Sequence, residues 1–153
     1  MPQNTTAPEA DSNRGSGDDP SQLSTPLALP PDSNLVMRVM PMPADTNMSG
    51  GVFGGWIMAQ VDIAGSVLPA RVSRGRVTTV AVNRFIFKQP VSVGDLLSFY
   101  ARVERIGTTS ITVHVEVYAE RNPAKPHVVK VTDASLTYVA IDKDGKPRPV
   151  PKD

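Results

Sequence analysis

The chain has 153 residues, no cysteine and a formal net charge of +1. The lack of cysteine excludes disulfides, a thiolate nucleophile and a cysteine-ligated metal, and the small net charge gives no indication of nucleic-acid binding. No apolar run approaches the roughly 20 residues that span a bilayer, so we expect no membrane insertion.

The first 32 residues differ in composition from the rest. They hold six prolines, five acids, one base and no aromatic residue, so they cannot bury enough apolar surface to offset their chain entropy. We predict a disordered tail over 1–32 and one folded domain over 33–153, ordered at about Asn34–Pro151. The tail has neither the pattern of a secretory signal nor the composition of a transit peptide, so we expect a cytoplasmic protein. Its composition favours an inert tail over a docking or regulatory segment.

The first part of the domain predicts a strand, a loop and a helix. The strand covers Asn34–Met40 and stops at Pro41, and the loop Ala44–Gly51 is rich in turn-forming residues. The segment Gly54–Leu68 has apolar residues on every side of a helical wheel, which indicates a buried helix. Pro69 ends this helix or kinks its last turn.

The second part of the domain predicts four strands. A basic cluster precedes them, for which a solvated turn is favoured over a phosphate contact: Arg71, Arg74 and Arg76. Short, turn-like links between the strands predict antiparallel neighbours, and one central helix wrapped by such a sheet is an α+β architecture. The strands, a turn and a proline-rich segment follow in this order: Val77–Lys88, Leu96–Ile106, Thr109–Arg121, His127–Ile141, Asp142–Gly145 and Lys146–Pro151.

The helix carries one ionisable group, Asp62. No lysine or arginine lies three or four residues away, and an isolated acid on an apolar helix is costly unless it is protonated, hydrogen-bonded or used in chemistry. Gly55 lies seven residues earlier on the same face, at a helix start whose free N–H groups suit an oxyanion. A carboxylate near a carbonyl held there acts as general base for water or as nucleophile. Together with Asn47 in the preceding loop, these residues predict acyl transfer to water; the alternative is a structural acid hydrogen-bonded to backbone or to a neighbouring subunit.

Other chemistries have weaker support. His114 lies in a predicted strand and His127 beside a loop, so a histidine-ligated metal is not expected, and Asp142–Gly145 lacks the later ligands of a calcium loop. The chain has no Walker loop, no GxGxxG after a strand and no GxSxG elbow. We therefore expect no metal and no cofactor.

Five stretches together resemble one known family, the YciA-type acyl-CoA thioesterases of the hotdog-fold superfamily. The DTN…GG.FGGW…D segment is specific to that family, and the spacing of Asn47, Gly55 and Asp62 matches it without insertion. The stretches follow the family's order: MPADTNMSGGVFGGWIMAQVDIAG, GRVTTVAV, PVSVGDLLSFYARV, GTTSI and YVAIDKDGKPRPVP.

The resemblance implies a central helix in a curved antiparallel sheet. It also implies dimers with a continuous sheet, usually assembled into hexamers, with active sites at the dimer interface. The implied reaction is hydrolysis of acyl-CoA to free acid and CoA. By position, Asp62 would activate water or attack the thioester, the N–H of Gly55 would hold the thioester oxygen, and Asn47 of the partner subunit would orient water or substrate. We extrapolate the polar contacts to CoA, whose phosphates require lysine or arginine, to Lys88, Thr108, Thr109, Ser110, Lys146 and Arg148.

The sequence departs from the family pattern at two places within the domain. Relatives more often carry an acid and then glycine where this chain has Asn83-Arg84, and Pro69 interrupts the end of the helix. Two other functions use the same fold. A non-catalytic acyl-CoA sensor would need a DNA-binding segment, for which the tail has no pattern. A hotdog dehydratase would need a catalytic histidine near the helix, and neither His114 nor His127 is placed there.

Overall fold

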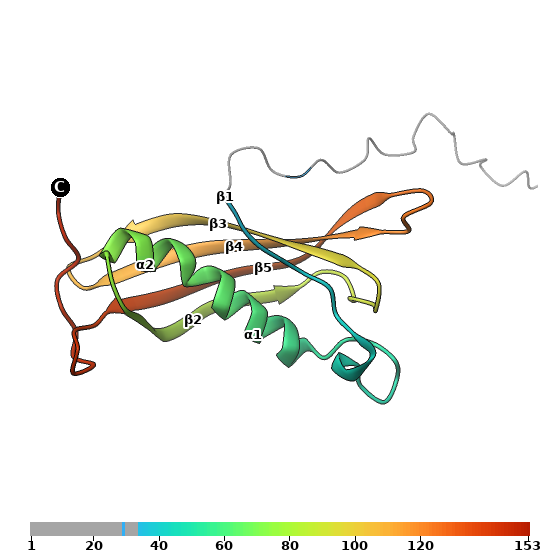
Figure 1. The fold of residues 1–153 in the computed structure, drawn as a ribbon, viewed down its shortest axis with the longest axis horizontal. Coiled ribbons are helices and arrows are strands. Elements are labelled where there is room, and N and C mark those ends of the chain that lie inside the picture. The colour runs from blue at the N-terminus through green and yellow to red at the C-terminus, as the bar shows by residue number, and fades with distance from the viewer. Residues whose placement is uncertain (1–28, 30–33) are drawn as a thin grey trace, which may run out of the picture.

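The computed structural model describes residue 29 and residues 34–153, so the disorder predicted for the tail lies outside the described residues (Figure 1). Every strand bound differs from the expected one by at most one residue, and no helix of the described residues is long and apolar enough to cross a bilayer. The elements in chain order are β1 (Asn34–Val39), η2 (Pro43–Asp45), α1 (Gly54–Gly65), α2 (Val67–Ser73), β2 (Val77–Phe87), β3 (Leu96–Ile106), β4 (Ser110–Arg121) and β5 (His127–Ala140).

The five strands form one antiparallel sheet in the order β1-β3-β4-β5-β2. The hairpin partners β3, β4 and β5 are neighbours as expected, but the prediction that β2 pairs with β3 is wrong. β2 lies on the far edge against β5, where Val77 pairs with Ala140 and Phe87 with Thr132. The link Lys88–Asp95, which we call the crossover, returns the chain to β3. Eight extended residues easily reach across the roughly 14 Å of three strand spacings, so link length alone did not separate a hairpin from a crossover.

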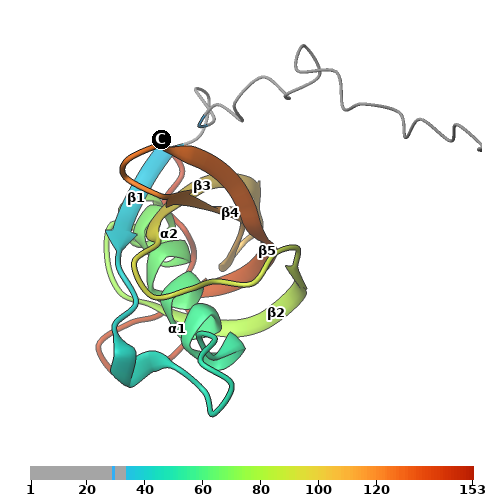
Figure 2. The same ribbon diagram turned by 90° about the vertical axis from the view of Figure 1, so that its right-hand side faces the viewer.

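The core lies between the concave face of the sheet and the two helices, around which the strands curve (Figures 1 and 2). The alternation expected in β4 is confirmed, because Val113, Val115 and Val117 have no exposed surface and pack in one cluster with Ile57 and Val61 of α1. Each fully buried valine stabilises the fold by roughly 1.5–3 kcal/mol. This packing confirms the predicted α+β arrangement of a central helix in a curved antiparallel sheet.

The helical segment does not end at Leu68. α1 stops at Gly65, and α2 then starts at Val67 and continues to Ser73. Pro69 lies in the first turn of α2, where a backbone N–H has no acceptor in the helix, so its missing N–H costs nothing there. The arginines after this helix are exposed, and Arg74 takes the left-handed conformation (φ 55°) that closes α2 in a turn.

The expectation that α1 is buried on all sides is wrong for the single chain. Ile57 and Val61 face the core, but Met58 and Ile63 are 41% and 54% exposed. The edge strand β2 is exposed as well, with Val82 at 48% and Phe87 at 50%. The apolar pattern of α1 therefore reflects one face that packs in this chain and a second face that this chain leaves open.

Candidate active site

The first turn of α1 offers free backbone donors. The carbonyl of Phe53 accepts the N–H groups of Trp56 and Ile57 at 3.1 and 3.2 Å, and no hydrogen bond within the described residues uses the N–H of Gly54 or Gly55. A Cβ added at Gly55 would meet nothing within 4 Å, whereas one at Gly54 would lie 3.1 Å from the Phe87 ring. Gly55 thus borders open space beside two N–H groups, as an oxyanion site requires.

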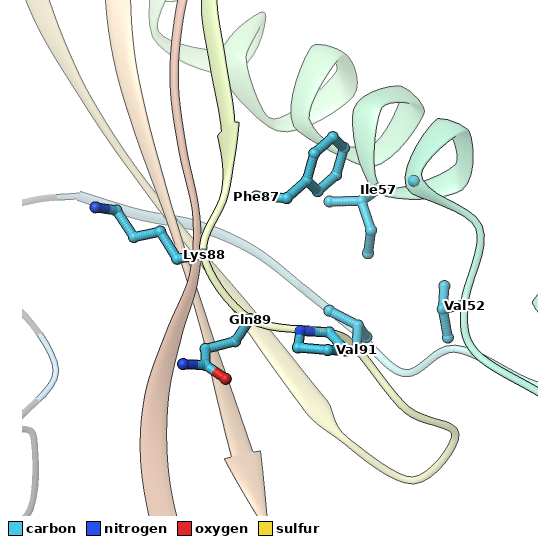
Figure 3. A pocket seen from close by; sticks show the side chains of 8 residues that line it. Val52, Ile57, Phe87, Lys88, Gln89 and Val91 are labelled. Atoms are coloured by element: carbon cyan, nitrogen blue, oxygen red, sulfur yellow. The ribbon is translucent and has the colours of Figure 1, made fainter.

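A pocket of about 350 Å³ opens beside this helix start (Figure 3). Phe87 and Ile57 lie on one side of it, and the side chains of Lys88 and Gln89 point away from Ile57. Its lining is mostly apolar and comes from the loop before α1, from α1, from β2 and from the crossover: Val52, Gly54, Ile57, Phe87, Lys88, Gln89, Pro90 and Val91.

Asp62 is half-buried and held by two hydroxyl groups. Its Oδ1 accepts a hydrogen bond from Thr79 Oγ1 at 2.6 Å and a longer one from the Tyr138 hydroxyl at 3.2 Å. Among the described residues, none of the ion pairs includes Asp62, as its helical neighbours predicted. The carboxylate therefore has two neutral donors that orient it and keeps its second oxygen for other partners.

Thr79 and Tyr138 were not predicted from the sequence, although Gly65 indicated that a group lies close to the helix backbone. The two residues are direct partners across β2 and β5, a pairing that the expected hairpin order did not contain. The Tyr138 hydroxyl also donates to the backbone oxygen of Asp62 at 2.7 Å, and a Cβ at Gly65 would lie only 2.5 Å from it. The third glycine of the helix is therefore required by the approach of a tyrosine to the helix backbone.

We expect Tyr138 to make the free energy of unfolding depend on pH in the alkaline range. Burial of the phenol, and next the negative charge of Asp62, raise the pKa of Tyr138 above its usual value. The folded chain therefore keeps a proton that the unfolded chain loses above about pH 10, so the free energy of unfolding falls there by at most about 1.4 kcal/mol per pH unit. Urea unfolding between about pH 9 and 11 should give a smaller slope for Tyr138→Phe than for the wild type. Equal slopes would contradict the assignment.

Asn47 organises the loop that leads to α1. Its Oδ1 accepts the N–H groups of Ser49 and Gly51 at 2.9 and 3.2 Å, and its own N–H donates to the Gly51 carbonyl at 2.7 Å. Within the described residues, no hydrogen bond uses the side-chain amide nitrogen of Asn47. The side chain is thus fixed through its oxygen while its NH₂ group remains a donor.

Asp62 and Gly55 lie on one face of α1 but are separated along the helix axis. Seven residues correspond to roughly 10 Å along a helix, so one small carbonyl cannot contact the N–H of Gly55 and the carboxylate of Asp62 in the same chain. A single chain therefore does not bring both groups to one carbonyl, although a longer ligand spans the distance between them. Two antiparallel copies of α1 would remove this difficulty.

The residues extrapolated to bind CoA fall into two groups at opposite ends of the sheet. The amide of Lys88, at the end of β2, donates to Val131. The other end holds the β3–β4 turn and the C-terminal segment, where Thr108 O accepts the N–H of Val150. Roughly 35 Å of β2 separates these ends. The second group comprises Thr108, Thr109, Ser110, Lys146 and Arg148.

Arg148 already has partners in its own chain. Its Nη2 donates to the carbonyl of Ser73 at 2.8 Å and its Nε to the carbonyl of Ile141 at 3.1 Å. The guanidinium also covers Gly75, where a Cβ would lie 2.5 Å from Nη2. The structure therefore gives Arg148 a role in attaching the C-terminal segment to α2, whether or not it also meets CoA.

The only group in the described residues with metal-ligand spacing lies on the convex face of the sheet. His114 Nε2 is 2.9 Å from Asp133 Oδ1, and Glu116 is the third member. Lys130 Nζ lies 2.7 Å from the other oxygen of Asp133 and 3.6 Å from Glu116, so an ammonium already balances these carboxylates. We interpret the cluster as polar contacts on the strand face where His114 was expected.

Comparison with known proteins gives one family. The family model of the thioesterase superfamily matches residues 49–125. The curated acyl-CoA thioester hydrolase YciA of Salmonella typhimurium is 47% identical over 123 residues, which are 79% of this chain and 92% of that protein.

Solved structures that are similar to this chain belong to the same kind of enzyme. The hexameric thioesterase y2039 from Yersinia pestis is 43% identical (TM-score 0.75, 80% of this chain and 99% of that chain). The hexameric hotdog fold thioesterase of Campylobacter jejuni is 40% identical (TM-score 0.74, 76% and 90%).

A more distant structure, the acyl-CoA hydrolase of Staphylococcus aureus, has been solved with alanine in place of an asparagine and, separately, of an aspartate. The two variants are 29% identical to this chain, with TM-scores of 0.70 and 0.68, and the alignments cover 75% of this chain and 68% and 70% of theirs. The two replaced positions are fifteen residues apart, as are Asn47 and Asp62.

Proposed function

Because the chain belongs to the thioesterase superfamily, with the hotdog fold and the sequence of a YciA-type acyl-CoA thioester hydrolase, we propose that Asp62, Gly55 and Asn47 carry out its hydrolysis of acyl-CoA to free acid and CoA. The single observation that supports this most is the half-buried carboxylate of Asp62, which is oriented by Thr79 and Tyr138 without a compensating cation among the described residues.

The site is completed by a second copy of the chain. The roughly 10 Å between Gly55 and Asp62 is bridged when an antiparallel partner helix places its own first turn opposite Asp62. The exposed side chains of Met58 and Ile63 on α1, and of Val82 on the unpaired edge β2, give the area that such a dimer covers. Pairing of two β2 strands also removes the free edge, which is otherwise open to aggregation. The hexameric relatives support further assembly as a trimer of dimers.

The same pairing explains the division of the CoA-binding residues. In an antiparallel β2–β2 pair, the end of one strand with Lys88 lies beside the start of the other, where Thr108 and Lys146 of the second chain are found. CoA carries a 3′-phosphate and a diphosphate, which need cations. Lysines from both chains therefore meet the phosphates of one CoA, while the apolar pocket beside Gly54 receives the acyl group.

The reaction proceeds by attack of water on the thioester carbonyl carbon. Asp62 accepts a proton from the water as the C–O bond forms, and the N–H of Gly55 stabilises the negative oxygen. Collapse of the tetrahedral intermediate breaks the C–S bond, and the proton on Asp62 passes to the CoA sulfur. Direct attack by Asp62, with an acyl anhydride that water then hydrolyses, uses the same groups.

Release of free thiol tests the reaction against the sensor alternative. The full chain is incubated with short, medium and long acyl-CoAs and a thiol reagent. Turnover is expected, and the dependence of the rate on acyl chain length reports how long an acyl group the pocket beside Gly54 accepts. Saturable binding of acyl-CoA with no thiol released would favour a non-catalytic acyl-CoA-binding protein. The cytoplasmic location and the lack of a metal or other cofactor stay predictions.

Asn47→Ala is expected to lower kcat about tenfold or more, because the side-chain NH₂ that orients water or substrate is lost. The loop also loses the two hydrogen bonds to Asn47 Oδ1. Asn47→Asp keeps both acceptor bonds and replaces the NH₂ donor with a negatively charged oxygen, so it separates loss of the donor from loss of the loop hydrogen bonds. Thiol release should fall in both variants, and wild-type rates in folded Asn47→Asp would remove Asn47 from the site.

A further inference from the structure

The crossover is anchored by an ion pair that lies outside the site described above, with a buried carboxylate and a guanidinium side chain that is 24% exposed. Asp95, at the end of the crossover, is 5% exposed, and its Oδ2 accepts a hydrogen bond from Arg121 Nε at 3.2 Å. The same carboxylate oxygen accepts the N–H of Ser92 at 2.9 Å, and Arg121 Nη2 donates to the carbonyl of Pro90. A guanidinium at the end of β4 therefore holds two points of the crossover at once, as its fork of donors permits.

The crossover in turn holds the segment that begins α1. The N–H of Val52 donates to the carbonyl of Val91 at 3.1 Å. On one side of Val52 lies Gly51, which is bonded to Asn47, and on the other lies Phe53, whose carbonyl accepts the first two helical hydrogen bonds. Each step from Arg121 to the helix start is thus one hydrogen bond or one peptide unit.

The same residues form a wall of the pocket. Pro90 and Val91 of the crossover and Val52 of the loop line it together with Gly54. Val91 is 6% exposed and belongs to the hydrophobic core, so a shift of the crossover would move both the core contact and the pocket wall. The sheet itself does not require the ion pair. The hydrogen bonds of the Arg121 side chain to Pro90 and to Asp95 are not among the backbone hydrogen bonds that pair the strands.

We propose that Arg121 and Asp95 are positioning residues for hydrolysis: they fix the crossover and, through the Val91–Val52 hydrogen bond, the place of the Gly55 N–H and of the pocket wall. This inference rests on the proposed function of Gly55. A misplacement of reacting groups by about 1 Å can cost about 100-fold in rate, so the pair acts on kcat. Neither residue is among those proposed above to meet the phosphates of CoA.

The test compares Arg121→Gln, Asp95→Asn and Arg121→Lys in thiol-release kinetics. We expect Arg121→Gln and Asp95→Asn to lower kcat at least tenfold while KM changes less than threefold. Arg121→Lys reaches only one of the two acceptors and should recover part of the loss. Arg38→Gln is the matched control, because Arg38 also bonds a side chain of the next strand, Ser98 at 3.0 Å, but lies on β1; it should keep wild-type kinetics.

Amide hydrogen exchange gives a readout that does not depend on the reaction. In Arg121→Gln and Asp95→Asn, exchange should accelerate at Ser92 and Val52 and stay unchanged in α2.

A folded variant with a lower melting temperature but kcat within twofold of the wild type would overturn the proposal, because the pair would then be merely structural. If Arg121→Gln does not fold, Asp95→Asn and Arg121→Lys decide by the same criteria. An inactive wild type would instead contradict the proposed function, while unchanged exchange at Val52 contradicts the positioning role alone.

Discussion

Asp62→Asn is expected to lower kcat for acyl-CoA hydrolysis at least a hundredfold. A positioned general base contributes typically about 10²–10⁴ in rate, and an amide cannot accept the proton of the attacking water. The substitution keeps the volume of the side chain and one oxygen that can accept from Thr79 and Tyr138. Thiol release at saturating acyl-CoA measures the effect.

The control for this variant is its fold and its affinity for the product. Asp62→Asn should unfold in urea close to the wild type and should bind free CoA with similar affinity, because the residues proposed to meet the phosphates do not include Asp62. If the variant kept more than about a tenth of the wild-type kcat, the loss in barrier would be only about 1.4 kcal/mol. That is too small for the base of the reaction, and the role of Asp62 would be wrong.

Val82→Asp is expected to separate the oligomer and to abolish turnover with it. Val82 is 48% exposed on the edge strand β2, and the proposed dimer covers it. An unpaired carboxylate in an apolar interface is strongly unfavourable. In the proposed dimer each site uses Asp62 of one chain and Gly55 of the other, so separated chains are expected to lose the reaction. Sedimentation or light scattering, measured beside thiol release, should show a smaller species with at least a hundredfold lower rate.

The opposite edge of the sheet supplies the control. Leu35 on β1 is 43% exposed, so Leu35→Asp places the same charge at a similar exposure on the other edge strand. It should keep the dimer and most of the activity. If instead Val82→Asp changed stability by no more than about 0.5 kcal/mol, as free surface positions do, and stayed active and oligomeric, the β2 edge would not be the interface.

The sequence predicted the local structure well because local patterns determine it. The alternation of Val113, Val115 and Val117 gave one face of β4, and these side chains form the core. The absence of a cation from the neighbourhood of Asp62 also followed from helical spacing, since the neighbours concerned lie within one turn.

The contacts that the sequence did not predict are those between distant segments. Thr79 and Tyr138 meet at Asp62 only because β2 crosses to the far edge and pairs with β5. Arg121 reaches Asp95 across the expected β3–β4 hairpin, where Leu96 pairs with Glu120, but its hydrogen bond to the Pro90 carbonyl depends on the path of the crossover. The apolar pattern of α1 predicted burial on every side of the helix, but within one chain Met58 and Ile63 remain exposed. Apolar periodicity indicates that a surface is covered but does not indicate by which chain.

The most direct test of the account is a crystal structure of the Asp62→Asn variant with an intact acyl-CoA bound. We expect the thioester carbonyl oxygen about 3 Å from the N–H of Gly55 of one chain, with its carbon beside position 62 of the other and the acyl group in the pocket next to Gly54. A thioester bound away from the start of α1, or one enclosed by a single chain with position 62 out of reach, would contradict the mechanism.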